Sequence, residues 1–233
     1  MKSIFIIPII VLLYNEMFAQ SHADEVQKRL KEFKINEGWL SSNLKEEDAI
    51  HYYKVKSTTG SINGNVTSIA DYDPRRKTGE RTRLLSVNGN PPTKKEAKKY
   101  DKRFDRNGND ANGKIDPTSY KIIEDNDEWF VVDFRLIKES LPDHYKFLGD
   151  CEAELHCRKD IMRASYSRFR NFQPTKVKMF DADKVDIEIY FTYDDDSESY
   201  VHEEARYYID VKIVGIASEV EVINYYSDYQ IVK

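Results

Sequence analysis

The sequence lacks most of the features that mark an enzyme or a membrane protein. It contains only two cysteines, and after Leu13 it has no apolar run near the roughly 20 residues that a membrane-spanning helix needs. There is no GxSxG motif, no glycine-rich phosphate loop and no HExxH motif, because His202-Glu203-Glu204 is not followed by a second histidine. We therefore expect a protein that is not an enzyme, uses no cofactor and has no transmembrane span in its mature chain.

Neither sign of charge dominates. The chain has 36 basic and 41 acidic residues, which gives a net charge of −5 and no positive field that would attract nucleic acid. Hydrophobic residues make up 40% of the chain and charged residues 33%, so there is enough apolar material for a core beneath a very polar surface. The composition favours a folded domain without a nucleic-acid partner.

The two cysteines, Cys151 and Cys157, lie in GDCEAELHCR, where apolar and polar residues alternate as in a strand. The intervening strand puts them roughly 20 Å apart, far beyond the reach of a disulfide. No CxxC motif accompanies them. We interpret both as small buried hydrophobic residues on one face of a strand.

The N-terminus, MKSIFIIPIIVLLYNEMFAQSHA, has the order of a secretory signal peptide: Lys2, an apolar run from Ile4 to Leu13, and small residues at Ala19 and Ala23. We assign residues 1–23 to the signal peptide and leave cleavage after Ala19 or after Ala23 open. No cysteine lies near either position, which excludes acylation of the lipoprotein type. The sequence predicts an exported protein, soluble after cleavage and periplasmic in a bacterium with two membranes.

Residues 24–233 have the pattern of one β-rich domain that begins with a helical segment over residues 24–48. In that segment, Val26, Leu30 and Phe33 have helical spacing, and Ser41 to Asp48 extends it. Further along, β-branched and aromatic residues alternate with polar ones between turn formers. This pattern predicts the strands Ile50 to Ser57, Asn65 to Tyr72, Arg81 to Val87, Trp129 to Ile137, Lys146 to Arg158, Arg163 to Phe169, Thr175 to Phe180, Val185 to Tyr193, Ala205 to Val214 and Glu219 to Tyr226.

Two of these predicted strands have a clear apolar face and a clear polar face. The apolar faces carry Val185, Ile187, Ile189 and Phe191 on one strand, and Tyr207, Ile209, Val211 and Ile213 on the other. A sheet with one dry and one wet face is typical of antiparallel pairing. The predicted fold class is therefore mainly β with a few helices, as a single curved antiparallel sheet or half-open β-barrel.

The segment from Arg81 to Tyr100, RTRLLSVNGNPPTKKEAKKY, predicts a strand, a turn and a helix in direct succession. The Asn-Gly pair tolerates positive φ, and the two prolines end the strand pairing. Thr93 and Glu96 have the spacing of a capping box, in which each side chain binds the backbone N–H of the other residue. We expect a lysine-rich and largely exposed helix from Lys94 to Phe104.

The loop DRNGNDANGKID partly matches a calcium-binding loop. Its oxygen-bearing residues are Asp105, Asn107, Asn109, Asp110, Asn112 and Asp116. Read from Asp105, the loop has Asp110 where a glycine should make the sharp turn; read from Gly108, it lacks the first ligand and ends on Ser119. The alternative is a polar connection, because exposed loops use the same residue types.

A basic patch lies in DPRRKTGERTR, formed by Arg75, Arg76, Lys77, Arg81 and Arg83. No aromatic residues are interleaved with these cations, which favours a solvated turn over a nucleic-acid site. The alternative is contact with an anionic lipid head group or with a protein partner.

Three stretches carry a family resemblance: YDPRRKTGERTRLLSVNGNPPTKKEAKKY, IDPTSYKIIEDNDEWFVVDFRL, and the strands that close on Tyr225-Tyr226-Ser227-Asp228-Tyr229. The chain resembles a group of exported bacterial proteins of uncharacterised function. Their strand layout is similar to that of the outer-membrane lipoprotein carriers, the LolA/LolB-like fold. The resemblance covers most of the chain after Ile50 and is most specific from Leu84 to Thr93. It implies a half-open antiparallel β-barrel with helices over its mouth.

The resemblance also implies where a ligand would bind. In the carriers the concave apolar face holds acyl chains, and the capped helix after Thr93 becomes a candidate lid. The corresponding groove residues are Val185, Ile187, Ile189, Phe191, Ile209, Val211 and Ile213. The first hypothesis is an exported, non-enzymatic binding protein that carries or senses a lipid, lipoprotein or other amphipathic ligand. The alternative is a cell-envelope interaction module in which the same residues fill a closed core and a partner protein binds elsewhere.

Overall fold

The computed structural model describes residues 23–35, 39, 50–61, 64–77, 79–105, 113–143, 145–177, 180–213 and 216–232. The predicted signal peptide, except for Ala23, and the predicted helical segment from Ser41 to Asp48 lie outside these residues. In the described part of the chain, no helix combines the length and the apolarity that crossing a membrane requires.

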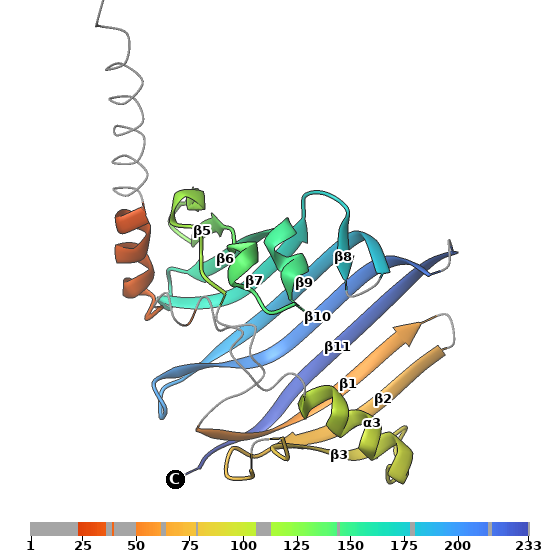
Figure 1. The fold of residues 1–233 in the computed structure, drawn as a ribbon. Helices are drawn as coiled ribbons and strands as arrows, with labels where there is room; N and C mark the ends of the chain where they lie inside the picture. Colours follow the sequence, from red (N-terminus) through yellow and green to blue (C-terminus); the bar gives the residue numbers. More distant parts are fainter. Residues whose placement is uncertain are drawn as a thin grey trace, which may run out of the picture.

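All described strands belong to one antiparallel sheet in the order β3-β2-β1-β11-β10-β9-β7-β6-β5-β4, with β8 paired to β9. Figure 1 shows this sheet as a single twisted layer. The strands are β1 (His51–Ser61), β2 (Gly64–Tyr72), β3 (Thr82–Val87), β4 (Lys121–Asp125), β5 (Trp129–Phe134), β6 (Cys151–Arg158), β7 (Arg163–Asn171), β8 (Thr175–Val177), β9 (Phe180–Asp194), β10 (Ser199–Ile213) and β11 (Ile216–Ile231). The sheet remains open, so the predicted fold class, a single antiparallel sheet with a few helices, is confirmed.

Two local predictions need correction. The residues from Lys146 to Asp150, predicted as the start of a strand, form the 3-10 helix η3. Phe147 and Leu148 are adjacent residues within η3, and both are buried. Adjacent side chains of a strand point to opposite faces, so a strand with one covered face would bury only one of the two. Strand β4 is missing from the prediction because it is almost wholly exposed and has no clean alternation of apolar and polar residues.

The sheet has an inner face, which carries the core, and an outer face. Strand β6 shows the division most clearly: Cys151, Ala153, Leu155 and Cys157 are all buried on the inner face. Both cysteines are free thiols, so the prediction made for them is confirmed. Burial raises the pKa of Cys151 to about 12, which keeps this thiol protonated and unreactive at neutral pH.

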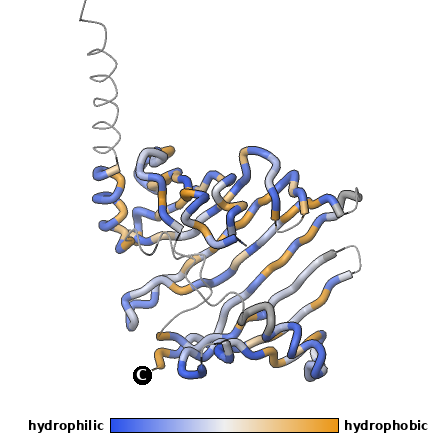
Figure 2. The backbone as a smooth tube through the Cα atoms, viewed as in Figure 1, coloured by the Kyte–Doolittle hydropathy of each residue, from blue (hydrophilic) through white to orange (hydrophobic). Residues whose placement is uncertain are grey.

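Short helices and loops cover the inner face over strands β5 to β9. They are η1 (Pro117–Ser119), η2 (Lys138–Ser140), η3 (Lys146–Asp150) and the helix over residues 23–32. Phe33 after the N-terminal helix stacks on Phe130 of β5 with ring centroids 5.5 Å apart, and Leu148 of η3 is 1% exposed. In Figure 2 the turn between β9 and β10 is blue and apolar stretches lie along the long strands, as expected for a core built on the sheet.

One tyrosine joins the N-terminal segment to the sheet. The Tyr200 hydroxyl donates a hydrogen bond to the Phe33 carbonyl at 2.5 Å and accepts one from the Ala164 backbone N–H at 2.8 Å. Tyr200 is 9% exposed, so both backbone partners would be left without water if the hydroxyl were removed. Burial raises the pKa of Tyr200 to about 12, and the hydroxyl therefore stays protonated and able to donate.

We expect Tyr200→Phe to lower the free energy of unfolding by about 1–3 kcal/mol, because it leaves two buried backbone groups unpaired. Tyr193→Phe is the matched control: Tyr193 packs edge-on against Tyr200, and no hydrogen bond of its hydroxyl is present among the described residues. Urea denaturation of both variants measures the difference. Equal stability of the two variants would contradict the role assigned to the Tyr200 hydroxyl.

The structure also favours one of the two cleavage positions left open by the sequence. Ala23 is 1% exposed and belongs to the core cluster together with Val26. Cleavage after Ala23 would remove this buried residue, whereas cleavage after Ala19 would keep it. We expect intact-mass analysis of the exported protein to give a chain that begins at Gln20. A chain that begins at Asp24 would contradict this expectation.

Candidate functional site

The inner face changes character between β9 and β10. Following the strand register outward from Ile187, the next inner residues are Tyr207 on β10, Val222 on β11 and Thr59 on β1. Ile187 is 2% exposed, whereas the other three are only half-buried. Val66, which lies opposite Thr59 on β2, is 47% exposed. The dry core therefore continues into a partly open surface.

We call this surface the inner strip. It consists of Tyr207 and Ile209 on β10, Val220, Val222 and Asn224 on β11, Val55, Ser57 and Thr59 on β1, and Val66 and Ser68 on β2. None of these residues carries a charge. The outer positions of the same strands include Lys54, Lys56, Arg206, Glu219 and Glu221. The strip is thus an uncharged, mainly apolar surface that crosses four strands.

The structure separates the groove residues predicted from the sequence into two groups. Five of them lie in the core, with exposed fractions of 6% or less: Val185, Ile187, Ile189, Phe191 and Val211. Ile209 is half-buried and belongs to the inner strip. The side chain of Ile213 lies outside the description. Sequence alternation found the correct face, and the register with β11, β1 and β2 shows where on that face the side chains are less covered.

The capping box predicted at the start of helix α3 (Lys94–Asp105) is present. The Thr93 backbone N–H donates to the Glu96 carboxylate at 2.7 Å, and the Glu96 backbone N–H donates to the Thr93 hydroxyl at 3.3 Å. The hydrogen bond from the Thr93 side chain holds the pKa of Glu96 below its usual value. Helix α3 packs beside β3, at one edge of the sheet (Figure 1). Its role as a lid remains a prediction.

The candidate calcium loop is only partly described. Residues 106–112, which include Asn107, Asn109, Asp110 and Asn112, lie outside the described residues, as does the side chain of Asp105. Asp116 caps η1, where its carboxylate accepts from the Thr118 backbone N–H at 2.9 Å and from the Thr118 hydroxyl at 2.7 Å. Within the described ranges, no group of three or more His, Cys, Asp or Glu residues could hold a metal ion. Calcium binding therefore stays a sequence prediction.

Three of the five cations of the basic patch pair with two carboxylates that the sequence analysis did not connect with it. Asp71, 3% exposed, accepts from Arg76 at 2.7 and 2.8 Å and from Arg83 at 2.9 Å. Asp73 accepts from Arg75 at 2.8 and 2.9 Å. The hydrogen bonds from Arg75 lower the pKa of Asp73 to about 2. These pairs favour the structural interpretation of the turn over a site for anionic head groups.

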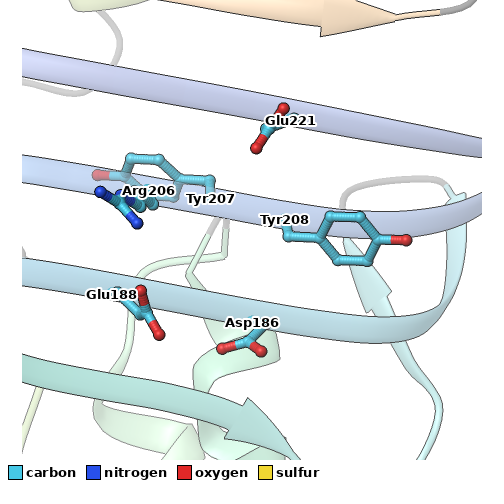
Figure 3. A pocket seen from close by; sticks show the side chains of 6 residues that line it. All are labelled: Asp186, Glu188, Arg206, Tyr207, Tyr208 and Glu221. Carbon is cyan, nitrogen blue, oxygen red and sulfur yellow. The ribbon is translucent and has the colours of Figure 1, made fainter.

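The outer face holds a shallow pocket of about 130 Å³, shown in Figure 3. Its lining residues are Asp186, Glu188, Arg206, Tyr207, Tyr208 and Glu221. Arg168 from β7 binds both carboxylate oxygens of Asp186 at 2.8 and 2.7 Å, and the Tyr190 hydroxyl donates to Glu188 at 3.0 Å. Much of the polar lining is therefore already paired within the sheet. The pocket contains no arrangement of nucleophile and base that would indicate catalysis.

One outer-face carboxyl is poorly compensated. Asp133 on β5 is 8% exposed, and its Oδ1 atom has no hydrogen-bond partner among the described residues. Glu154 on β6 and Lys121 on β4 lie directly opposite it in the register. Burial, together with the negative charges of Glu152 and Glu154, raises the pKa of Asp133 to about 6. The sequence does not indicate this raised pKa, because the charged residues opposite Asp133 come from other strands and the two nearest residues on its own face of β5 are Trp129 and Val131.

Comparison with solved structures finds similar chains, and three of them can be named. The first is a LolA superfamily protein from Nitrosomonas europaea, with a TM-score of 0.38 and 11% identity over 91% of this chain and 94% of that one. The second is a putative outer membrane lipoprotein-sorting protein domain from Vibrio parahaemolyticus, with a TM-score of 0.39 and 10% identity over 90% of this chain and 93% of that one. The third is a DUF1329 family protein from Desulfovibrio piger, with a TM-score of 0.35 and 7% identity over 86% of this chain and 92% of that one. No family model and no curated protein matches the chain. The LolA-like resemblance seen in the sequence thus recurs among solved structures, at a similarity that indicates no ligand and no activity.

Asp133 should make stability depend on pH. The pKa of Asp133 is higher in the folded state than in the unfolded state, so folding takes up a proton at intermediate pH. The contribution of the protonated carboxyl to the free energy of unfolding is complete below the unfolded pKa near 3.8 and is lost as the pH rises through about 6. One pKa unit corresponds to about 1.4 kcal/mol, so the loss is about 2–3 kcal/mol. We expect Asp133→Asn to remove this dependence, so that the variant gains stability relative to the wild type between pH 4 and pH 8. Parallel unfolding curves for the two proteins over this range would contradict the assignment.

Proposed function

We propose that this protein binds an elongated apolar ligand, such as the acyl chain of a lipid, along the inner strip, and that it acts by binding without catalysis. The observation that carries the proposal is the change from full to half burial along one continuous inner face. Ile187 on β9 is fully buried in the core, and its register partners Tyr207, Val222 and Thr59 on the next strands are only half-buried. Exposed apolar surface of this kind is typical of a ligand or partner site.

The shape and chemistry of the strip suit an acyl chain. Neighbouring strands lie about 4.8 Å apart, so the four strands of the strip span roughly 15 Å, the length of about a dozen methylene groups. Each methylene that is removed from water contributes about 0.8 kcal/mol, and about ten of them would contribute about 8 kcal/mol before the cost of immobilising the ligand. Burial alone can therefore give useful affinity, and no buried ion pair has to form.

The predicted signal peptide indicates in which compartment the protein would meet its ligand. If residues 1–23 direct export as their pattern predicts, the ligand is one that is met in the cell envelope, where lipids and acylated molecules are abundant. Carrying or sensing such a ligand requires neither a nucleophile nor a metal. The described residues offer no metal site, and both cysteine thiols are buried and protonated.

A pair of neighbouring substitutions on β11 tests this proposal. Val222 lies in the inner strip, whereas the adjacent Ile223 is half-buried on the outer face opposite Thr58 and Arg206. We expect Val222→Glu to weaken binding of a fluorescent acyl probe by about tenfold or more, because the new carboxylate must lose its water where it meets the acyl chain. Ile223→Glu should change the dissociation constant by less than about twofold.

Thermal unfolding of both variants verifies that each remains folded before the titrations are compared. Equal loss of probe binding in the two variants would place the binding site elsewhere. Failure of the wild-type protein to bind any acyl probe would overturn the proposal itself.

A further inference from the structure

A row of small polar side chains crosses the otherwise apolar inner face. In the strand register, Asn224 on β11 lies opposite Ser57 on β1, and Ser57 lies opposite Ser68 on β2. The same row continues in the other direction through Ala205 and Ile189 to Ser167 on β7. Ser68, Ser57 and Asn224 therefore stand side by side on one level of the inner strip, and Val222 and Val55 lie on the levels to either side.

These polar groups are not used to hold the fold together. The Ser167 hydroxyl is fully buried, and it has no hydrogen-bond partner among the described residues. Asn224 is 7% exposed, and no hydrogen bond joins its side-chain amide to another described residue. The amide donors and the acceptor of Asn224 are thus not committed to another described group, and a ligand on the inner strip can use them.

The charges around the row are equally informative. Asp, Glu, Lys and Arg are all absent from the inner strip, so a carboxylate or an ammonium group placed beside Asn224 would meet no opposite charge. A desolvated ion without a counter-charge is strongly disfavoured. An ester carbonyl is uncharged, and it can accept hydrogen bonds from the Asn224 amide and from the serine hydroxyls.

On the premise of the proposed function, we propose that Asn224, with Ser57 and Ser68, binds the ester group of a neutral acyl ester and thereby selects esters over free fatty acids. The residues next to the row, Val222 and the methyl group of Thr59 on one side and Val55 on the other, bind the hydrocarbon. Asn224 is in this respect a specificity-determining residue. Its removal affects the recognition of the ester and leaves burial of the chain intact.

The test compares three fluorescent probes with the same hydrocarbon: a long-chain fatty acid, its methyl ester, and the alkane that lacks the carboxyl carbon. At about pH 8, where the acid is ionised, we expect the wild-type protein to bind the ester about tenfold more tightly than the acid, which corresponds to about 1.4 kcal/mol. Asn224→Leu should weaken ester binding about five- to tenfold and leave alkane binding unchanged or tighter. Asn65→Leu, the same substitution on the outer face of β2, should change neither value.

The double variant Ser57→Ala, Ser68→Ala provides a second test if Asn224→Leu proves unstable, because it removes two hydroxyls from the row without adding bulk. We expect the same loss of preference for the ester over the alkane. If all three probes bind equally well to the wild type and the variants, the assignment of Asn224 is wrong while acyl binding stands. If none of the probes binds to the wild type, the proposed function itself is wrong.

Discussion

The structure depends on continuous antiparallel pairing that runs from β3 at one edge to β4 at the other. Because paired residues in such a ladder point to the same side, the register between two bulges fixes the faces of the side chains that it pairs. Ile187, Tyr207, Val222 and Thr59 face the same way although they come from four strands and distant parts of the chain. A shift of one residue in any single pairing would bring charged outer residues such as Arg206 or Glu221 onto the inner face.

Much of this arrangement could be predicted from local sequence signals. The alternation in β6, β9 and β10 gave the correct apolar face, and Thr93 with Glu96 gave the correct start of α3, because both depend only on residues close in the chain. The free, buried state of Cys151 and Cys157 followed from strand geometry alone. Strand β4 was not predicted because an exposed edge strand such as Lys121–Asp125 needs no apolar face and therefore has no alternating pattern in its sequence.

The division of the inner face into core and strip could not be predicted in the same way. Alternation shows which side of a strand is apolar, and it does not show what covers that side. The core cluster that contains Ile187 and Ile189 also contains Leu30 of the N-terminal helix and Leu148 of η3, which come from segments far apart in the sequence. The pairing of Asp71 and Asp73 with the arginines of the basic patch was also missed, because ion pairs depend on side-chain geometry and not on spacing alone.

The distribution of stabilising contacts explains how such a sheet can keep an apolar surface partly open. The large aromatic and aliphatic side chains that are fully buried, among them Phe33, Phe130, Phe134 and Phe169, lie on β5, β7 and the N-terminal segment. Burial of a large apolar side chain contributes about 1.5–3 kcal/mol, so this half of the molecule can supply most of the hydrophobic stabilisation. Strands β10, β11, β1 and β2 add smaller groups of buried side chains, such as Tyr53, Tyr72 and Tyr226, whose rings contact one another. These groups and the backbone pairing hold the four strands together, so Val222 and Thr59 of the inner strip can remain half-buried.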